Sequence, residues 1–102
     1  MFRITIYSEA HVTNFVVEGT LVGPWVKELE ILWESALAAE SFGAALVNVA
    51  DVIFIDSEGK ELLTRMRRQG AMLVSAGVLM NAIVAEIEAE VKKEEQLWAY
   101  RP

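Results

Sequence analysis

The sequence predicts an α/β fold: a single domain over residues 1–102, with a mixed β-sheet, packed α-helices and the element order ββαβαβα. Two observations carry this prediction. The chain begins with a segment in which apolar and polar residues alternate, which is the period of a half-buried strand. Later, strand-length apolar runs alternate with segments whose apolar residues recur every three or four positions, which favours βαβ crossovers. A chain of 102 residues has room for one such core.

The first half of the chain predicts two strands and a helix. Residues 2–7 alternate in polarity, and residues 13–18 are rich in β-branched and aromatic side chains. The polar residues 8–11 between them, including His11, form a natural hairpin loop. Pro24 suits the first position of a helix, where its missing N–H costs nothing. The apolar face of that helix has the expected spacing and consists of Trp25, Val26, Leu29, Leu32, Trp33, Ala36 and Leu37.

The second half predicts alternating strands and helices. Two apolar runs, residues 45–49 and 52–55, flank Asp51 and are typical of a strand covered on both faces or central in a sheet. A helix follows, which ends near Gly70 and has its apolar positions at Leu62, Leu63 and Met66. Residues 71–75 form the next strand. We expect one core that contains Phe15, Val17, Trp33, Val47, Val49 and Leu73, with Trp25 buried on the same helix face as Trp33.

The last predicted element is an amphipathic helix over residues 79–97. Its apolar stripe, which we expect to pack on the sheet, consists of Met80, Ile83, Val84, Ile87 and Val91. Its acidic residues are expected to face solvent and to pair with Lys92 and Lys93 of the same helix. They are Glu86, Glu88, Glu90, Glu94 and Glu95. Trp98 and Tyr100 are expected to cover an edge or a second subunit.

Composition excludes several functional classes. The net charge is −6, which disfavours binding to a phosphate backbone, so we expect no nucleic-acid partner. There is no Cys and a single His, which excludes thiolate zinc sites, thiol nucleophiles and multi-His metal sites. We expect no metal, no cofactor and no enzymatic activity. Any metal site would have to be built from carboxylates alone.

The distribution of hydrophobic residues favours a cytoplasmic protein without membrane insertion. Residues 69–85 lack charge, but they are fewer than the roughly 20 apolar residues that span a bilayer. Gly70, Ser75, Gly77 and Asn81 also interrupt them. The N-terminus lacks the basic region and long apolar run of a signal peptide.

A strand-to-helix junction carries the most specific signal in the sequence. After the apolar run that ends in Phe54 and Ile55 come Asp56, Ser57 and, two positions later, Gly59. This junction resembles the signature of the STAS domain, the module shared by anti-sigma factor antagonists and sulphate transporters. The resemblance extends upstream to residues 17–21, which match the family's second strand and the glycine and leucine that close it. It extends downstream to residues 70–74, which match the strand after the second helix.

The resemblance implies a non-catalytic interaction module in bacterial signalling. In the antagonists, a partner kinase phosphorylates the serine directly after the aspartate, and the match carries this role to Ser57. The implied partner is an anti-sigma-type kinase or a related signalling protein. Asp56, Glu58, Gly59 and Lys60 are the implied contact residues, with Gly59 allowing close approach of a partner backbone. A phosphoserine would add about −1.5 to −2 charge to this contact and could expel the partner.

The sequence also departs from the family pattern. Glu58 stands where the family has Ser or Thr, Lys60 replaces an apolar residue, and Val22 stands where many antagonists have an acidic residue. We also expect the family's last strand and helix to be absent or rebuilt.

Three alternatives follow from the residues themselves. Ser57 or Asp56 could serve only as a helix N-cap, the role their side chains commonly play at such junctions. The domain could instead sense a small ligand, a nucleotide or an apolar molecule, against the sheet. It could also be a structural homodimer subunit whose apolar C-terminal stripe is buried by its twin.

Overall fold

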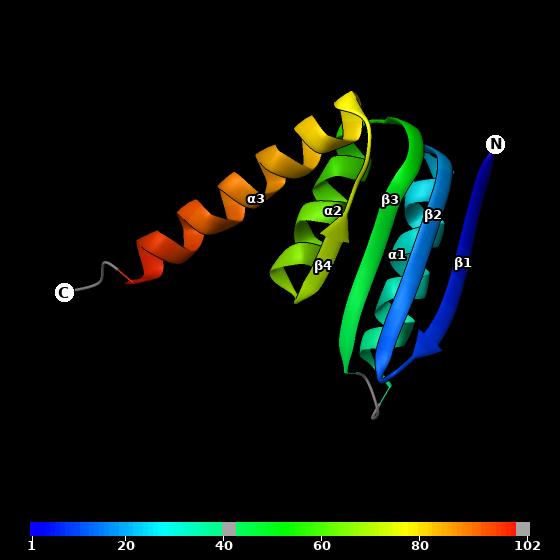
Figure 1. Ribbon diagram of the computed structural model, residues 1–102, viewed down its shortest axis with the longest axis horizontal. Helices are drawn as coiled ribbons and strands as arrows, with labels where there is room; N and C mark the ends of the chain where they lie inside the picture. The colour runs from blue at the N-terminus through cyan, green and yellow to red at the C-terminus, as the bar shows by residue number, and fades with distance from the viewer. Residues whose placement is uncertain (40–42, 100–102) are drawn as a thin grey trace.

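A four-stranded mixed sheet and three helices form the fold in the computed structural model, which describes residues 1–39 and 43–99 (Figure 1). Side chains are described as far as Leu97, so the expectations for Trp98 and Tyr100 lie outside the described residues. The sheet order is β1-β2-β3-β4. The predicted class and the order ββαβαβα are confirmed. The elements are β1 (Phe2–Glu9), β2 (Val12–Leu21), α1 (Pro24–Leu37), β3 (Ala44–Ile55), α2 (Ser57–Arg68), β4 (Ala71–Val74) and α3 (Val78–Ala99).

A tight hairpin joins the two antiparallel strands β1 and β2. Glu9 pairs with Val12, which leaves Ala10 and His11 as a two-residue turn. Both have positive φ, 51° and 66°, as a type I′ turn requires. The turn is therefore shorter than the predicted loop over residues 8–11, because Ser8 and Glu9 continue the strand.

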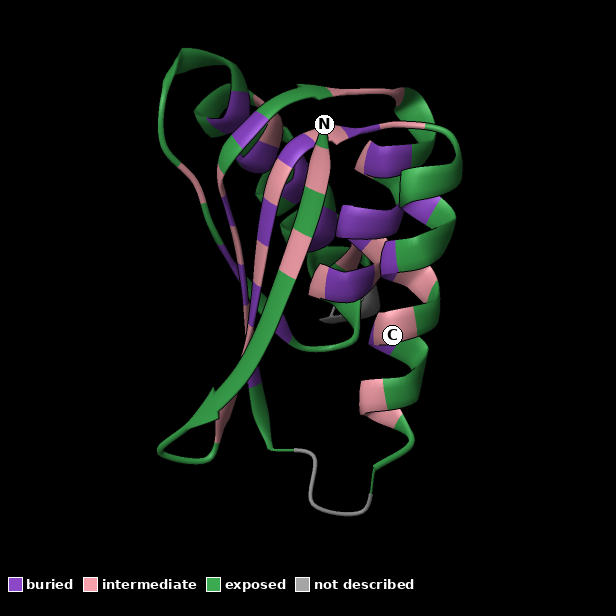
Figure 2. Cartoon of the chain, turned by 90° about the vertical axis from the view of Figure 1, so that its right-hand side faces the viewer, coloured by how far each residue is buried: buried purple, intermediate pink, exposed green. Residues whose placement is uncertain are grey.

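The three parallel strands bring their carboxyl ends to one edge of the sheet. β2 pairs with β3 and β3 with β4, both in parallel. The chain leaves this edge through residues 21–24, 55–57 and 74–78, and the N-terminus joins it because the Thr20 N–H donates to the Met1 carbonyl at 2.9 Å. We call this side of the molecule the carboxyl edge. The crossover helices α1 and α2 lie on one face of the sheet (Figure 2).

β3 is a single long strand with two irregularities in its pairing. Val16 pairs with Asn48 but Glu18 with Asp51, so β3 carries an extra residue there. The Asn48 side-chain oxygen accepts a hydrogen bond from the Ala50 N–H at 2.9 Å, which satisfies the backbone at this bulge. The expectation that β3 is central is confirmed, since it pairs on both sides. Its second apolar run is not covered on both faces, because Ile53 and Phe54 are 70% and 57% exposed.

The core lies between the sheet and the helices and contains the six predicted residues. Phe15, Val17, Trp33, Val47, Val49 and Leu73 are all buried. The Phe15 and Trp33 rings meet edge to face with centroids 5.5 Å apart. The Trp33 indole N–H also donates to the Gln69 side-chain oxygen at 2.7 Å, which links α1 to the end of α2.

The prediction that Trp25 is a core residue is wrong. Its side chain is 40% exposed and stacks on the Phe2 ring, with centroids 5.3 Å apart. Trp25 lies in the first turn of α1, at the carboxyl edge. The helical spacing correctly predicts that Trp25 faces the sheet. The residue that it contacts, Phe2, belongs to the edge strand β1, so one side of the indole stays in solvent.

α3 packs against α2 and β3, and it runs away from the body of the sheet (Figure 1). Four residues of its predicted stripe, Met80, Val84, Ile87 and Val91, are buried, and Ile83 is partly buried. The stripe was predicted correctly, but its main neighbour is a helix and not the sheet face. Because this chain already covers the stripe, the proposed burial of the stripe by a twin subunit loses its basis.

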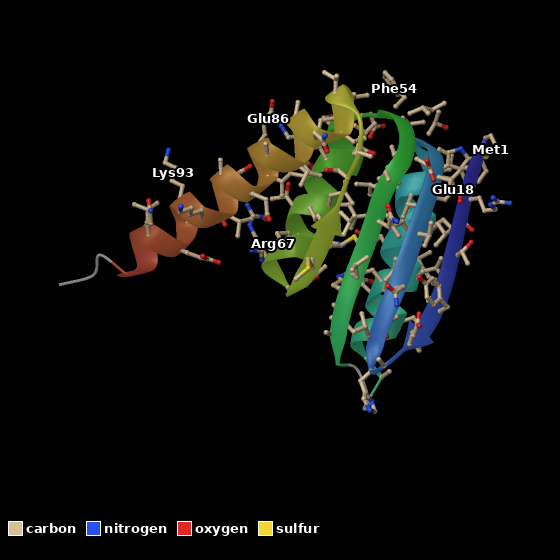
Figure 3. The ribbon with its side chains drawn as sticks, in the orientation of Figure 1. Met1, Glu18, Phe54, Arg67, Glu86 and Lys93 are labelled. Carbon is tan, nitrogen blue, oxygen red and sulfur yellow. The ribbon has the colours of Figure 1, made fainter. Side chains whose placement is uncertain are left out.

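The acidic residues of α3 do not form the purely solvated face that was predicted. Several of them pair with cations of α2 and not with the lysines of α3. Arg67 pairs with Glu88 at 2.6 Å, and Arg68 with Glu94 at 2.5 Å and Glu90 at 3.7 Å. Lys60 pairs with Glu86. Arg67 is visible between α2 and α3 in Figure 3. A row of interhelical ion pairs therefore borders the apolar contact.

The burial of α1 and α2 predicts unequal costs for two leucine truncations. Leu63 is fully buried, whereas Leu32 is only partly buried. Leu63→Ala should lower the free energy of unfolding by about 2–5 kcal/mol, and Leu32→Ala by clearly less, because less apolar surface is lost. Urea unfolding followed by circular dichroism measures both. Equal losses would show that the two helix faces are wrongly assigned.

Candidate functional site

Asp56 connects the starts of two helices at the carboxyl edge. It follows β3 directly, and its extended backbone (φ −93°, ψ 179°) makes it the N-cap of α2. One carboxylate oxygen accepts the Gly59 N–H at 2.8 Å, and the other accepts the Gly23 N–H at 3.1 Å. Gly23 is the N-cap residue of α1. A single carboxylate therefore holds the β2–α1 and β3–α2 connections together.

These hydrogen bonds lower the pKa of Asp56. The N–H of Gly59 contributes most and that of Gly23 next, because both stabilise the ionised carboxylate. A carboxylate that is committed to two backbone donors and has a lowered pKa is poorly suited to accept a proton. Asp56 therefore has the properties of a structural cap and not those of a general base.

Gly59 lies in the first turn of α2 and is buried. A Cβ added here would lie 2.6 Å from the Leu21 carbonyl oxygen and 2.7 Å from the Ile55 side chain. The close approach that this glycine permits is therefore to Leu21 of the same chain, and not to a partner backbone as expected. This contact lets α2 start directly against the end of β2.

Ser57 occupies the first position of α2 and is exposed. Because Asp56 is the cap, the alternative in which Ser57 caps the helix is wrong. Glu58 is also exposed, whereas Lys60 is partly covered and pairs with Glu86 of α3. Ser57 and Lys60 line the same polar groove between α2 and α3, together with Thr64.

Exposed apolar side chains lie along the same carboxyl edge as this first turn, and sequence reasoning missed most of them. More than half of the large exposed apolar side chains among the described residues belong to segments at the carboxyl edge, and Figure 3 shows Phe54 there. A signal was present: Asn48 and Asp51, two polar residues three positions apart, cannot share a face of a regular strand. The edge group is Met1, Trp25, Ile53, Phe54, Val78 and Leu79, whose exposed fractions are 82%, 40%, 70%, 57%, 92% and 48%.

A groove between α1 and α2 has a volume of about 510 Å³ and is lined mostly by charged side chains, with Val26 and Leu62 at its apolar part. Some of these charged side chains pair with one another. Arg65, for example, contacts Glu30 at 2.8 Å. Within residues 1–39 and 43–99 no three His, Asp or Glu side chains gather in a way that could hold a metal ion. In the same residues no helix has the length and apolar character needed to cross a membrane.

The lowered pKa of Asp56 predicts a pH-dependent stability difference. A carboxyl group whose pKa is lower in the folded state stabilises the fold above its unfolded pKa of about 4, and this contribution disappears as pH falls through the folded value. The parent should therefore be more stable than Asp56→Asn near pH 7, with the difference shrinking in acid.

Urea unfolding at several pH values measures this difference. Glu58→Gln is the matched control, because it removes a charge from the same turn without removing either hydrogen bond of Asp56. Its effect should be small and reduced by salt. A pH-independent gap between the parent and Asp56→Asn would contradict the role of the ionised carboxylate.

Comparisons with known proteins place the fold. No family model and no curated protein matches the sequence. Among solved structures, the anti-sigma factor antagonist SpoIIAA in its unphosphorylated form is similar over 81% of this chain and 80% of its own, with a TM-score of 0.62 and 20% identity. An uncharacterised protein of the DUF3478 family from Shewanella loihica, described as having a SpoIIAA-like fold, is similar over 78% of this chain and 70% of its own, with a TM-score of 0.54 and 17% identity.

A third similar structure, that of Mglu, is matched over 72% of this chain with a TM-score of 0.51 and 15% identity. This chain spans only 19% of Mglu. At these identities the likeness concerns the fold. The chain has the SpoIIAA-like α/β fold that its resemblance to the STAS domain implied.

Proposed function

We propose that this chain is a non-catalytic protein-interaction module of bacterial signalling that works in the cytoplasm. It binds an anti-sigma-type kinase or a related signalling protein through the carboxyl edge, and phosphorylation of Ser57 switches that binding. The observation that carries the proposal is the exposed hydroxyl of Ser57 in the first turn of α2, on an edge that also exposes six large apolar side chains. Asp56, Glu58 and Lys60 contribute to the contact surface or hold it in shape.

The physical chemistry of the edge supports a protein partner. Apolar side chains gathered at one exposed edge are typical of an interaction surface. The charged groups beside Ser57 are acidic, which disfavours nucleic acid as an occupant. The groove between α1 and α2 is lined mostly by charged side chains, which disfavours an apolar small ligand there.

Phosphorylation would change this surface without any change of fold. A kinase transfers the γ-phosphoryl group of a nucleoside triphosphate to the Ser57 oxygen: a P–O bond forms there, the bond to the β-phosphate oxygen breaks, and the hydroxyl proton is released with the diphosphate. The surface gains about −1.5 to −2 charge. A partner packed on it would have to desolvate that charge. SpoIIAA, which has this fold, is an anti-sigma factor antagonist whose structure is known in its unphosphorylated form, and this supports such a use of the fold.

Phe54 provides a test of the contact surface. Phe54→Ser should weaken capture of the partner from a lysate of the source cell by tenfold or more, because it removes a large apolar contact. Met72→Ser is the matched control: Met72 is similarly exposed, at 65%, but lies on β4 away from the carboxyl edge. The affinity is measured by titrating each variant against the captured partner. Equal binding by Phe54→Ser and the parent would exclude the carboxyl edge as the contact surface.

Ser57 provides a test of the switch. Ser57→Ala should bind the partner as the parent does, whereas Ser57→Asp should bind several-fold more weakly, because only the second variant adds charge. Glu58→Ser, which restores the family pattern, should increase phosphorylation by the cognate kinase. If both Ser57 variants bind as the parent does, phosphorylation does not control the contact.

Mass measurement of the protein from its native source separates the proposal from its alternatives. A phosphorylated fraction that is lost in Ser57→Ala supports switching. A retained small molecule supports a ligand sensor, and an unmodified dimer supports a homodimer subunit whose interface is not the α3 stripe, because that stripe is covered within the chain.

A further inference from the structure

Lys60 links the proposed phosphorylation site to α3. Its side chain is 37% exposed and pairs with Glu86, whose side chain is 62% exposed. Ser57 and Lys60 are three positions apart, so they lie on the same side of α2 and are separated by about 4.5 Å along its axis. Both line the polar groove between α2 and α3. The Lys60 ammonium is therefore within side-chain reach of a group attached to the Ser57 oxygen.

A phosphate on Ser57 would need a nearby cation. Its neighbours Asp56 and Glu58 are acidic, and the Asp56 carboxylate already uses the Gly59 N–H at the helix start. Arg68 is too far away, since 11 positions of α2 correspond to about 16 Å. It is also engaged with Glu94 and Glu90. Lys60 is the cation of α2 that is nearest in sequence to Ser57.

We propose that phosphorylation of Ser57 draws the Lys60 side chain away from Glu86 and thereby loosens the N-terminal half of α3 from α2. This inference rests on the proposed role of Ser57 as the phosphoacceptor. The phosphate carries up to twice the charge of the Glu86 carboxylate and is attached to the same helix as Lys60. Glu86 is more than half exposed, so its carboxylate is readily solvated once the pair is broken.

The loosened segment carries part of the proposed contact surface. Val78 and Leu79, at the start of α3, are exposed members of the edge group. The contacts of Arg67 and Arg68 with Glu88, Glu90 and Glu94 lie further along α3 and do not involve Lys60. Phosphorylation would thus add charge at Ser57 and increase the motion of Val78 and Leu79, while the distal half of α3 stays paired.

The test uses the full chain with phosphoserine incorporated at position 57 during translation, so that no kinase or partner is needed. Hydrogen exchange of backbone amides is followed over residues 80–87, which precede the first retained ion pair, and, separately, over residues 91–96. Exchange over residues 80–87 should become about two- to fivefold faster, the range expected for loss of an exposed ion pair. Exchange over residues 91–96 should not change.

Three control chains make the result specific. Phosphoserine in place of Ser35, an exposed residue of α1, adds the same charge elsewhere and should leave α3 unchanged. Lys60→Gln should speed exchange over residues 80–87 without phosphate, and phosphoserine at position 57 should then have no further effect. Glu86→Gln removes the same pair from the α3 side and should reproduce this behaviour if Lys60→Gln fails to fold.

Two results would overturn the coupling. One is unchanged exchange over residues 80–87 in the chain with phosphoserine at position 57. The other is an undiminished effect of that phosphoserine in the Lys60→Gln chain or, if that chain fails to fold, in the Glu86→Gln chain. Neither depends on partner capture, so a failure of the proposed function and a failure of this coupling are distinguishable.

Discussion

The carboxyl edge depends on the two hydrogen bonds accepted by the Asp56 side chain. By binding the Gly59 N–H and the Gly23 N–H, one carboxylate fixes the start of α2 relative to the start of α1. Gly59 completes the arrangement, because only a residue without Cβ lets α2 begin against the Leu21 carbonyl. The exposed position of Ser57 follows from this: with Asp56 as the cap, the next residue is turned outward and its hydroxyl is not needed by the helix.

α3 is held by apolar burial and by charge, and the two contributions have different consequences. Burial of Met80, Val84, Ile87 and Val91 supplies the attraction, since surface ion pairs contribute little each. The ion pairs with α2 instead select the orientation, because a rotated α3 would leave several glutamates without partners. An orientation that depends on exposed charges responds to a new charge more readily than a core contact does.

The sequence predicted what depends on local periodicity and missed what depends on pairing between segments. The helix faces around Leu29 and Trp33 and the stripe on α3 were visible because a helix repeats every 3.6 residues. The bulges of β3 were missed, because they arise from its register with β2, and the spacing of Asn48 and Asp51 was the only local sign of the first one; Ile53 and Phe54 are exposed at the second. The sequence also did not predict that α3 packs mainly on α2, because periodicity indicates which face of a helix is buried but not which element covers it.

The two departures from the family pattern in the first turn of α2 take on complementary roles in the structure. Glu58 adds a negative charge beside Ser57, and Lys60 adds a positive charge two positions later. Residues two apart do not face each other on a helix, so the two side chains do not neutralise one another. Lys60 is turned to α3 and Glu58 remains exposed at the edge. The unmodified edge is therefore already anionic, and the cation that could offset an added phosphate is held by another element. Under the proposed coupling, a phosphate on Ser57 acts on α3 through Lys60, so the placement of Lys60 matters as well as the exposed hydroxyl.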